Sequence, residues 1–441
     1  MAAHPADEGG KMLTAAEAAA YLGVKLGTLY AYVSRGWLKS YRRKVGRQAL
    51  YRRADIEALR GLTAPERGVR ARSLPEASSW VTIAQPTADA SVSGVIVAES
   101  SVSSISEGRL AYRGYPIEEL VGQASFEEVC LLLWNGERPR PEEVEHLREN
   151  IALARLPKPV AAALAAIGED APPLLRLAVM MPALAAGEHR LPRRARLDQA
   201  RLIIGALPLA MTPAPGTEAA AARDGGAGMA ARLLERVAGA AAPADRAALD
   251  RVLVACAEHE LNASTFAARV VASTGADLYA CVLAALCSLS GPIHGGACDR
   301  IEQMFGELAA GLEIERCLES FRERGVLPPG FGHAIYPAGD PRAVLLKRVA
   351  QATAPRKGRA LYQTALKVER AVWERTRLKP NLDFYLTVCV RMLGLPQGMP
   401  AAIFAVGRTA GWIAHSLEQY ANNRLIRPRM RYRGSPLRHW A

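Results

Sequence analysis

The sequence predicts a mainly α-helical protein in which a small N-terminal unit precedes a much larger helical unit. Ala and Leu dominate and only 6% of residues are aromatic, a composition that favours helices over sheets. Apolar residues recur at helical spacing through most of the chain. A Pro-, Arg- and Ser-rich stretch near residues 63–78 indicates a linker. With 441 residues, half of them hydrophobic, the chain can bury a large core.

Composition also limits the class of protein. No apolar run approaches the roughly 18 residues that span a bilayer, and residues 278–289, the longest candidate, are predicted to form a buried helix. The first eight residues lack the basic start and apolar stretch of a secretory signal. The seven cysteines show no CxxC spacing. We therefore expect a cytoplasmic protein with reduced thiols and no membrane partner.

The net charge of +13 is concentrated at the two ends of the chain. Residues 1–72 hold 14 basic and 6 acidic side chains, and residues 424–441 hold 6 arginines and no acid. The rest of the chain has a net charge of −1. The excess charge therefore belongs to two local functions and not to the whole surface.

Residues 11–62 are predicted to form a small domain after a disordered N-terminus, residues 1–10. Thr14 and Glu17 have the spacing of a capping box, in which each side chain accepts a hydrogen bond from the other residue's backbone. They open a helix that ends at Gly23.

A second helix, a wing and a short third helix complete this domain. The second helix is predicted at residues 25–33 and is broken at Gly36. Residues 37–51 alternate enough to form a two-stranded wing that turns at Gly46, and residues 55–59 add a short helix. Helix, tight turn, helix and wing form a winged helix-turn-helix pattern.

Residues 13–24 and 28–36 resemble the excisionase and MerR-type DNA-binding modules. Basic side chains cluster on the second helix and wing, as expected for contacts with DNA phosphates. The candidates are Lys25, Arg35, Arg42, Arg43, Arg47 and Arg52. Short helix-turn-helix segments also mediate dimerisation or protein binding, which is the alternative.

The large unit follows the linker, which we place at residues 63–80. Strand signals are confined to residues near 90–112, and a long helical region is predicted to start within residues 112–120. Ser125, followed three residues later by Glu128, opens the next helix. The Ala-, Gly- and Pro-rich stretch at 212–229 is the predicted internal loop.

Three short irregular segments carry acid–base groups. The loop Gly-Phe-Gly-His-Ala-Ile-Tyr-Pro-Ala-Gly-Asp-Pro-Arg places His333 nine residues before Arg342. His294 lies in Gly-Pro-Ile-His-Gly-Gly, and Asp383 lies in Pro-Asn-Leu-Asp-Phe-Tyr. Each residue alone has a structural explanation, such as a helix N-cap for Asp383. Their combination indicates acid–base chemistry on a small anionic substrate.

Together these segments resemble the active site of the citrate synthase family, over roughly residues 90–434 and with the motifs in the family's order. The resemblance implies the family's mainly helical fold, in which a large and a small domain close over substrate. The large domain would comprise residues 81–297 and 396–441, and the small domain residues 298–395.

The resemblance also implies an activity, the condensation of acetyl-CoA with oxaloacetate followed by hydrolysis of the thioester. Asp383 would be the base, His294 the donor to the thioester oxygen and His333 the donor to the oxaloacetate carbonyl. The substrate-binding residues would be His259, Arg342, Arg408 and Arg427. Arg427 would reach the neighbouring subunit's site, which implies a homodimer or a multiple of dimers. No metal is implied, and no cofactor beyond the coenzyme A thioester that serves as substrate.

Two alternatives remain open. Cys298, Ala334 and Leu386 stand where many bacterial members carry Asn, Arg and Ser, which leaves propionyl-CoA as an alternative acyl donor. The other alternative is a DNA-binding transcriptional regulator whose synthase-like domain senses a CoA ester or a dicarboxylate. A pure sensor would not need Asp383 or His294, so their presence favours the enzyme.

Overall fold

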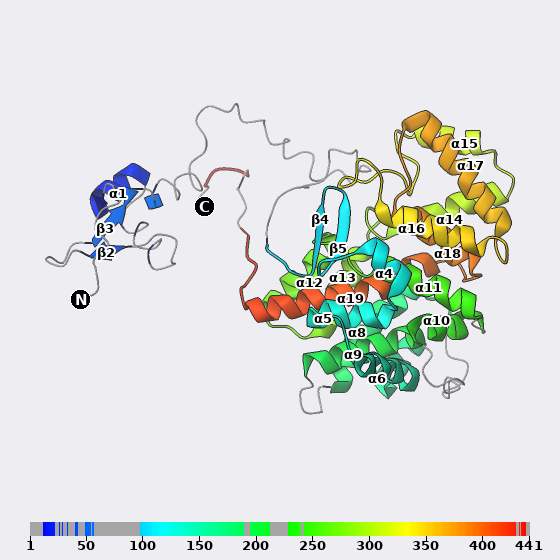
Figure 1. The fold of residues 1–441 in the computed structure, drawn as a ribbon, viewed down its shortest axis with the longest axis horizontal. Coiled ribbons are helices and arrows are strands. Elements are labelled where there is room, and N and C mark those ends of the chain that lie inside the picture. Colours follow the sequence, from blue (N-terminus) through cyan, green and yellow to red (C-terminus); the bar gives the residue numbers. More distant parts are fainter. Residues whose placement is uncertain are drawn as a thin grey trace. The chain divides into compact units, whose positions relative to one another are not determined.

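The chain divides into two compact units, Met1–Ile83 and Ala84–Ala441. The structure, shown in Figure 1, is a computed structural model. The residues that it describes are 12–22, parts of 26–56, 98–428 without 189–194, 212–227 and 240–241, and a few positions in 432–437. The expected disordered N-terminus and the expected linker, residues 1–10 and 63–80, lie outside the described residues.

The N-terminal unit contains a three-stranded antiparallel sheet in the order β1-β3-β2. Its elements are β1 Met12–Thr14, α1 Ala15–Leu22, β2 Tyr41–Arg42 and β3 Ala49–Arg52. The prediction of a two-stranded wing was therefore incomplete, because β1 pairs with β3 and places Leu13 opposite Tyr51. A three-residue strand is too short to show alternation, so the sequence pattern missed it.

The predicted capping box of α1 is confirmed. The Thr14 backbone N–H donates to Glu17 Oε2 at 2.8 Å, and the Glu17 N–H donates to Thr14 Oγ1 at 3.3 Å. Of the predicted second helix, only Leu26, Leu29 and Val33 are described, and these are helical. The predicted breaks at Gly23 and Gly36 and the predicted wing turn at Gly46 lie outside the described residues.

The large unit starts with a three-stranded antiparallel sheet in the order β4-β5-β6. The strands are β4 Ser103–Ser106, β5 Arg109–Tyr112 and β6 Tyr115–Pro116. The helix predicted to start within 112–120 begins only at Ile117, because Arg113 and Gly114 adopt left-handed φ angles of 48° and 87° and turn the chain into β6. The preceding residues are therefore strand and turn.

The rest of the described part of this unit consists of helices joined by loops (Figure 1). The first ten are α4 Ile117–Gln123, α5 Phe126–Asn135, α6 Pro141–Leu153, α7 Lys158–Ala166, α8 Pro173–Glu188, α9 Arg196–Ala210, α10 Met229–Ala238, α11 Pro243–Cys256, α12 Ala263–Ser273 and α13 Leu278–Leu289. The last six are α14 Gly296–Ala309, α15 Ile314–Glu323, α16 Pro341–Thr353, α17 Arg359–Thr376, α18 Leu382–Met392 and α19 Met399–Asn422. The capping box of Ser125 and Glu128 opens α5 as predicted, and the predicted buried helix is α13.

Helix α19 forms the centre of the large unit. Every residue from Met399 to Ser416 is buried, including the polar Arg408 and His415. A helix that is buried on all sides must contact neighbours all round, and α19 packs against α5, α8, α11, α12, α13 and α18. In Figure 1 it runs through the middle of the bundle.

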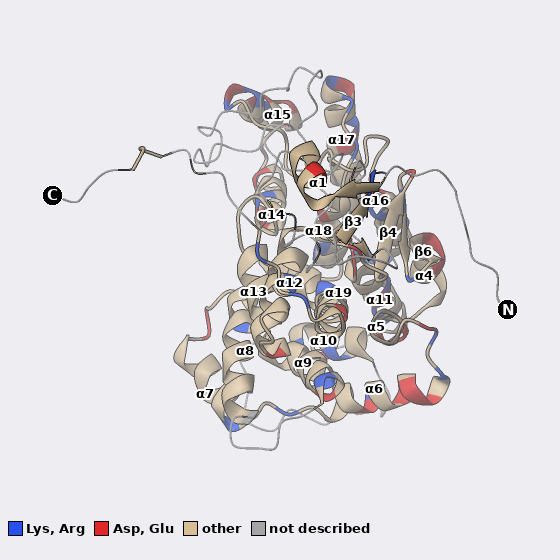
Figure 2. Ribbon diagram, turned by 90° about the vertical axis from the view of Figure 1, so that its left-hand side faces the viewer, with Lys and Arg blue, Asp and Glu red and all other residues tan. Residues whose placement is uncertain are grey.

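Helices α14 to α18 gather at one end of the large unit, beside the bundle around α19 (Figure 1). Charged residues lie on outer helices such as α6, α15 and α17, whereas the helices around α19 are mostly uncharged (Figure 2). The small-domain boundaries at 298 and 395 remain a prediction. None of the described helices is both long and apolar enough to cross a membrane.

Gly407 allows α19 to approach α11 closely. A Cβ atom at Gly407 would lie 2.7 Å from Cys256 Cβ and 2.9 Å from the Leu253 carbonyl oxygen. Four residues later, Gly411 donates its N–H to the Ala257 carbonyl at 3.0 Å, and a Cβ there would overlap the Glu258 carboxylate. Two glycines one helical turn apart thus bring the two backbones together.

We expect Gly407→Ala to lower the free energy of unfolding by about 1–3 kcal/mol, because the added methyl overpacks this contact. The matched control is Gly306→Ala in α14, where a Cβ meets nothing within 4 Å. There alanine should raise the free energy of unfolding by about 0.5–1 kcal/mol through its higher helix propensity. Chemical denaturation monitored by circular dichroism measures both changes, and changes of equal sign would contradict the close-approach account.

Candidate active site

Backbone hydrogen bonds join the loop that carries His333 to the segment that carries Asp383. The Gly332 N–H donates to the Lys379 carbonyl, and the Asn381 N–H donates to the Gly330 carbonyl, both at 2.9 Å. Gly330 has a φ of 85°, and a Cβ there would lie 2.9 Å from Phe384 Cβ. Only glycine fits at this point, so the first glycine of the loop places the two reactive segments side by side.

Asp340 links the same two segments through its side chain. It caps α16 by accepting from the Arg342 N–H at 3.0 Å, and its Oδ2 accepts from the Leu382 N–H at 3.0 Å. Arg342 returns a bidentate pair to this carboxylate, at 2.9 and 2.7 Å. Burial opposes the charge on Asp340, but the Arg342 guanidinium holds the pKa of Asp340 below its usual value. Asp340 contacts Nε and Nη2 of Arg342 but not Nη1.

His333 and His259 lie edge to face, with ring centroids 5.3 Å apart. The Ile335 N–H donates to His333 Nδ1 at 3.2 Å, which places the ring proton of neutral His333 on Nε2. His259 Nε2 lies 3.0 Å from the Tyr336 hydroxyl oxygen. Two imidazoles and one phenol, those of His259, His333 and Tyr336, therefore lie together in the site.

Burial and nearby cations keep these imidazoles uncharged. Burial and Arg342 lower the pKa of His333 to about 4. Burial, Arg342 and Arg408 lower the pKa of His259 well below its ordinary value. A neutral imidazole can still donate one hydrogen bond, and it adds no further positive charge beside the two arginines.

His294 lies between α13 and α14, and burial followed by Arg408 lowers its pKa to about 4. Its Nε2 lies 2.9 Å from Ser264 Oγ, which also accepts from Trp412 Nε1 at 3.1 Å. The same hydroxyl lies 2.8 Å from Asn262 Oδ1, to which it can donate because an amide oxygen only accepts. Ser264 carries one proton, which it can give either to Asn262 or to His294. Giving it to His294 Nε2 leaves the ring proton on Nδ1.

Asp383 occupies the first turn of α18, where it is half-buried. Burial raises the pKa of Asp383 to about 6, and Arg342 and Arg408 limit that rise. The Cys298 thiol of α14 lies 3.9 Å from Asp383 Oδ1 and is the donor of this weak contact. The carboxyl can therefore exchange a proton near neutral pH.

Arg408 has a buried hydrogen-bond donor that no described residue satisfies. Its Nε donates to the Cys256 carbonyl at 2.6 Å, and its guanidinium lies 4.6 Å from the centre of the Phe404 ring. Its Nη2 is buried and has no hydrogen-bond partner among the described residues. An unsatisfied buried donor costs about 1–3 kcal/mol, so this nitrogen is suited to a ligand oxygen.

Six of the seven predicted site residues converge: His259, His294, His333, Arg342, Asp383 and Arg408. Arg408 lowers the pKa values of His259, His294 and Asp383, and Arg342 lowers those of His259 and Asp383. Arg427 is exposed in the extended segment after α19 and stays a prediction that concerns a second copy of the chain.

The predicted DNA contacts fall mostly outside the described residues. These are Lys25, Arg35, Arg43 and Arg47, together with the side chain of Arg42. Arg52 is exposed on β3, with its guanidinium 5.0 Å from the centre of the Tyr41 ring.

Three residues that organise the site were not predicted from the sequence. Asp340 could have been found, because Asp before Pro is a common way to cap a helix. Tyr336 lies in the loop already singled out, but nothing in the sequence pairs it with His259. Ser264 is 30 residues from His294, and no local pattern reveals so distant a contact.

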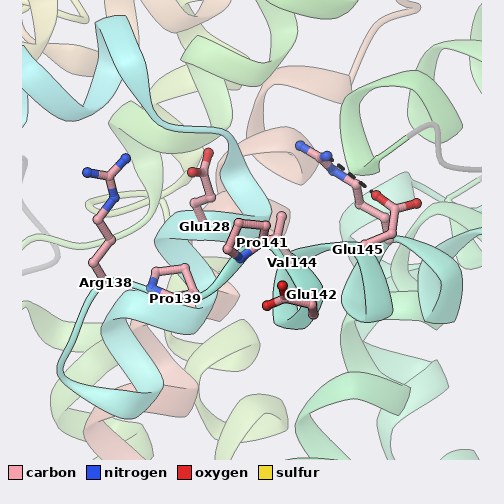
Figure 3. Close-up of a pocket in the computed structure, with 8 residues that line it drawn as sticks. Glu128, Arg138, Pro139, Pro141, Glu142, Val144 and Glu145 are labelled. Atoms are coloured by element: carbon pink, nitrogen blue, oxygen red, sulfur yellow. Dashed lines mark ion pairs between the residues drawn. The ribbon is translucent and has the colours of Figure 1, made fainter.

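The described part of the large unit also has a surface hollow of about 720 Å³ (Figure 3). Glu128, Arg138 and the start of α6 line it. Its charged groups include Arg148, which lies 3.7 Å from Glu145 and 3.8 Å from Glu127. It contains none of the predicted site residues.

Comparison with known families is consistent with both units. Residues 91–429 match the model of the citrate synthase C-terminal domain, and residues 12–60 match a helix-turn-helix domain model. The chain is 36% identical to citrate synthase 2 of Bacillus subtilis, over 79% of this chain and 96% of that protein. It is 32% identical to the 2-methylcitrate synthase of Shewanella oneidensis, over 78% and 94%.

Solved structures give the same result. The citrate synthase of Thermotoga maritima superimposes with a TM-score of 0.69 at 31% identity, covering 79% of this chain and 96% of that one. A ternary complex of Thermoplasma acidophilum citrate synthase with carboxymethyl coenzyme A and oxaloacetate gives a TM-score of 0.69 at 26% identity, with the same coverage. The fold, the converging residues and these matches show that the chain belongs to the citrate synthase family of acyltransferases and carries a helix-turn-helix domain at its N-terminus.

Proposed function

We propose that the large unit condenses acetyl-CoA with oxaloacetate and hydrolyses the resulting citryl-CoA to citrate and CoA. The observation that carries this proposal is the site itself. A carboxyl with a pKa of about 6 lies among imidazoles held neutral beside two buried arginines. Such a site can remove a weakly acidic proton, stabilise oxygen charge by hydrogen bonding, and bind a dicarboxylate.

Asp383 is the proposed base for the first step. It takes a methyl proton of the thioester, and the electron pair of that C–H bond moves toward the thioester oxygen as the enol forms. His294 donates to this oxygen through Nδ1, a role that requires Ser264 to give its own proton to His294 Nε2. Each such group contributes roughly 10²–10⁴-fold to the rate.

His333 is the proposed donor for the second step. The enol carbon bonds to the ketone carbon of oxaloacetate, and the carbonyl oxygen becomes an alkoxide that takes the Nε2 proton of His333. His259, Arg342 and Arg408 hold the substrate, with Arg408 Nη2 free to bind a carboxylate oxygen. Water then cleaves the thioester, which releases the CoA thiol and leaves the new carboxylate.

The quaternary structure and the cofactor requirement are part of the same proposal. Arg427 is exposed on an extended segment after α19 and would complete the carboxylate site of a second copy in a homodimer or multiple of dimers. The reaction uses the CoA thioester as substrate and needs no metal, because imidazoles and guanidinium groups provide the charge stabilisation. We also assign the protein to the cytoplasm, because its seven cysteines are free thiols.

Propionyl-CoA is the alternative acyl donor. Relatives named citrate synthase and 2-methylcitrate synthase match over similar shares of the chain. Cys298 contacts the proposed base directly, so a residue in which this chain departs from many family members borders the reacting carbon. A test of the acyl donor therefore has to compare both thioesters.

Purified protein should release CoA thiol when given oxaloacetate and acetyl-CoA, measured with a thiol reagent and compared with propionyl-CoA. Asp383→Asn keeps the size of the side chain but removes the base, so turnover should fall at least about 10²-fold. If neither donor is turned over while oxaloacetate still raises the melting temperature, the synthase proposal fails. The ligand-sensing regulator would then remain.

The pH dependence of kcat/KM should show an acid limb near pH 6. Below the raised pKa of Asp383 the carboxyl is protonated and cannot act as base, so kcat/KM should fall about tenfold per pH unit. Cys298→Ala removes a donor to the charged carboxylate and should move this limb to higher pH. Cys317→Ala is the control, because it also removes a buried thiol but one that lies on α15, whereas the thiol that contacts Asp383 lies on α14. A profile flat between pH 5 and 7 would contradict the role of Asp383.

DNA binding by residues 11–62 is a second function that we propose. It is favoured by the helix-turn-helix match and by the excess of basic residues in this unit. Full-length protein should bind duplex DNA with an affinity that falls as salt rises, measured by fluorescence anisotropy.

Arg52→Ala should weaken this binding without changing CoA release, whereas Arg109→Ala, an exposed change on β5, should affect neither. Absence of binding to mixed duplexes at low salt would overturn the proposal and leave a dimerisation or protein-binding role.

A further inference from the structure

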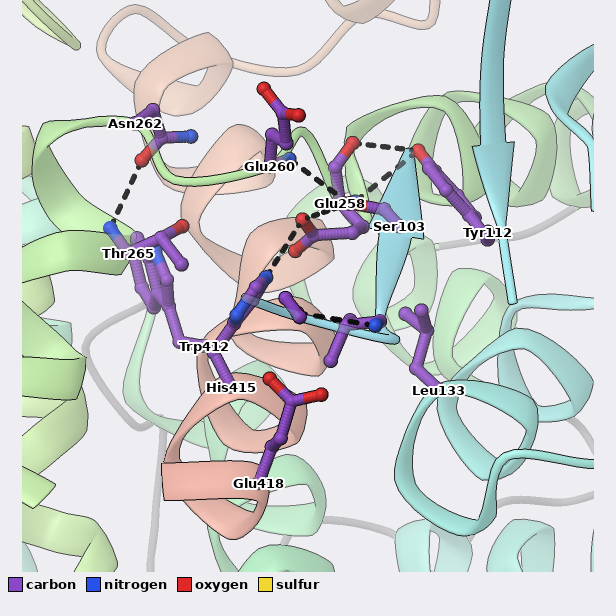
Figure 4. Close-up of polar contacts among 12 residues, drawn as sticks. Ser103, Tyr112, Leu133, Glu258, Glu260, Asn262, Thr265, Trp412, His415 and Glu418 are labelled. Atoms are coloured by element: carbon purple, nitrogen blue, oxygen red, sulfur yellow. Dashed lines mark hydrogen bonds and ion pairs between the residues drawn. The ribbon is translucent and has the colours of Figure 1, made fainter. Parts of the chain in front are cut away.

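We propose that Ser103 of β4 is a positioning residue that holds His259 in the active site. The inference rests on the proposed function, because it gives His259 its role in substrate binding. It arises from contacts made by the residues on either side of His259, which the proposed mechanism does not use. Figure 4 shows these contacts.

Ser103 contacts both sequence neighbours of His259. Its hydroxyl donates to Glu258 Oε1 at 2.9 Å and accepts from the Glu260 backbone N–H at 3.2 Å. Glu260 has a φ of 52°, a left-handed conformation that is unfavourable for a residue with a side chain. The hydroxyl thus stabilises a tight bend that presents His259 to the site.

The adjacent strand fixes the same peptide from a second direction. Tyr112, at the end of β5, donates its hydroxyl proton to the Glu258 carbonyl at 2.9 Å and accepts from the Glu258 N–H at 3.2 Å. Ser103 and Tyr112 are paired residues of the β4–β5 ladder. Residues of the small sheet therefore hold the backbone at Glu258 and Glu260 by hydrogen bonds.

A buried polar chain holds the Glu258 side chain from the opposite side. His415 Nε2 lies 3.0 Å from Glu258 Oε1, and Arg269 Nη1 donates to His415 Nδ1 at 2.9 Å. Because Arg269 can only donate, His415 must carry its proton on Nε2 and donate it to Glu258. Arg269 is held in turn by Glu418, at 2.5 Å. Ser103 is the member of this assembly that contacts both sides of His259.

The orientation of His259 depends on this bend. Its Nε2 reaches the Tyr336 hydroxyl at 3.0 Å, and its ring lies 5.3 Å from that of His333. Rotation of the peptide between Glu258 and Glu260 would carry the ring away from both. Loss of the Ser103 hydroxyl removes the side-chain acceptor of the Glu260 N–H, so the bend should relax.

The test compares Ser103→Ala with Ser104→Ala, an exposed change one residue along the same strand, and with Ser103→Thr, which keeps the hydroxyl. We expect Ser103→Ala to raise the KM for oxaloacetate about five- to tenfold, the effect of one lost hydrogen bond. The KM for acetyl-CoA should change less than twofold. Ser104→Ala should match wild type, and Ser103→Thr should recover most of the oxaloacetate affinity. Isothermal titration of oxaloacetate provides a readout independent of turnover.

The outcomes are distinct. If Ser103→Ala lowers the melting temperature but leaves the KM for oxaloacetate and its binding unchanged, Ser103 is only a structural residue and the inference is overturned. Equal effects of Ser103→Ala on both substrates would also overturn it, because they would indicate a general loss of the site. Failure of the wild-type protein to bind or turn over oxaloacetate would refute the proposed function instead.

Discussion

The buried Asp340–Arg342 pair is the interaction on which the candidate site depends. One carboxylate caps α16, accepts the backbone N–H at the start of α18 and neutralises a guanidinium, so two helix starts and a cation share a single group. A buried pair of this kind adds little net stability, but removal of one partner typically costs about 3–5 kcal/mol. Its contribution is therefore geometric: it fixes Arg342 relative to Asp383, and the glycine loop between Gly330 and Asp340 can then place His333 beside them.

The site combines two arginines with three imidazoles, and burial determines how they coexist. In water a histidine beside two guanidinium groups would lose its proton readily, and burial strengthens that tendency. The result is a set of neutral hydrogen-bond donors beside two guanidinium groups, which is suited to an anionic substrate. Asp383 experiences the opposite balance, because burial favours its neutral form while the same arginines favour its charged form. The same electrostatic environment thus keeps the imidazoles neutral and gives the Asp383 carboxyl a pKa of about 6.

The sequence located the residues of the candidate site better than the residues that position them. Six of them lie in short motifs whose order follows a known family, so they could be located from the sequence alone. These are His259, His294, His333, Arg342, Asp383 and Arg408. The Thr14 and Ser125 capping boxes were predictable because the interaction is local. Strand β1 was missed because it has three residues, and Ser264, Tyr336 and Ser103 because their partners are far away in sequence. No sequence pattern pairs His415 with Glu258, 157 residues away, and only the fold reveals this contact.

Helix α19 also constrains how the chain can change in length. Arg408, Trp412 and His415 lie on this helix and reach Cys256, Ser264 and Glu258, all within one short segment. Each helical residue adds about 1.5 Å of rise and roughly 100° of rotation. A single inserted residue between Arg408 and His415 would therefore turn the later contacts away from that segment while the earlier one stayed in place. The spacing of these three side chains along the helix is therefore fixed. During evolution, an insertion or deletion would be tolerated in the connecting loops but not between these three side chains.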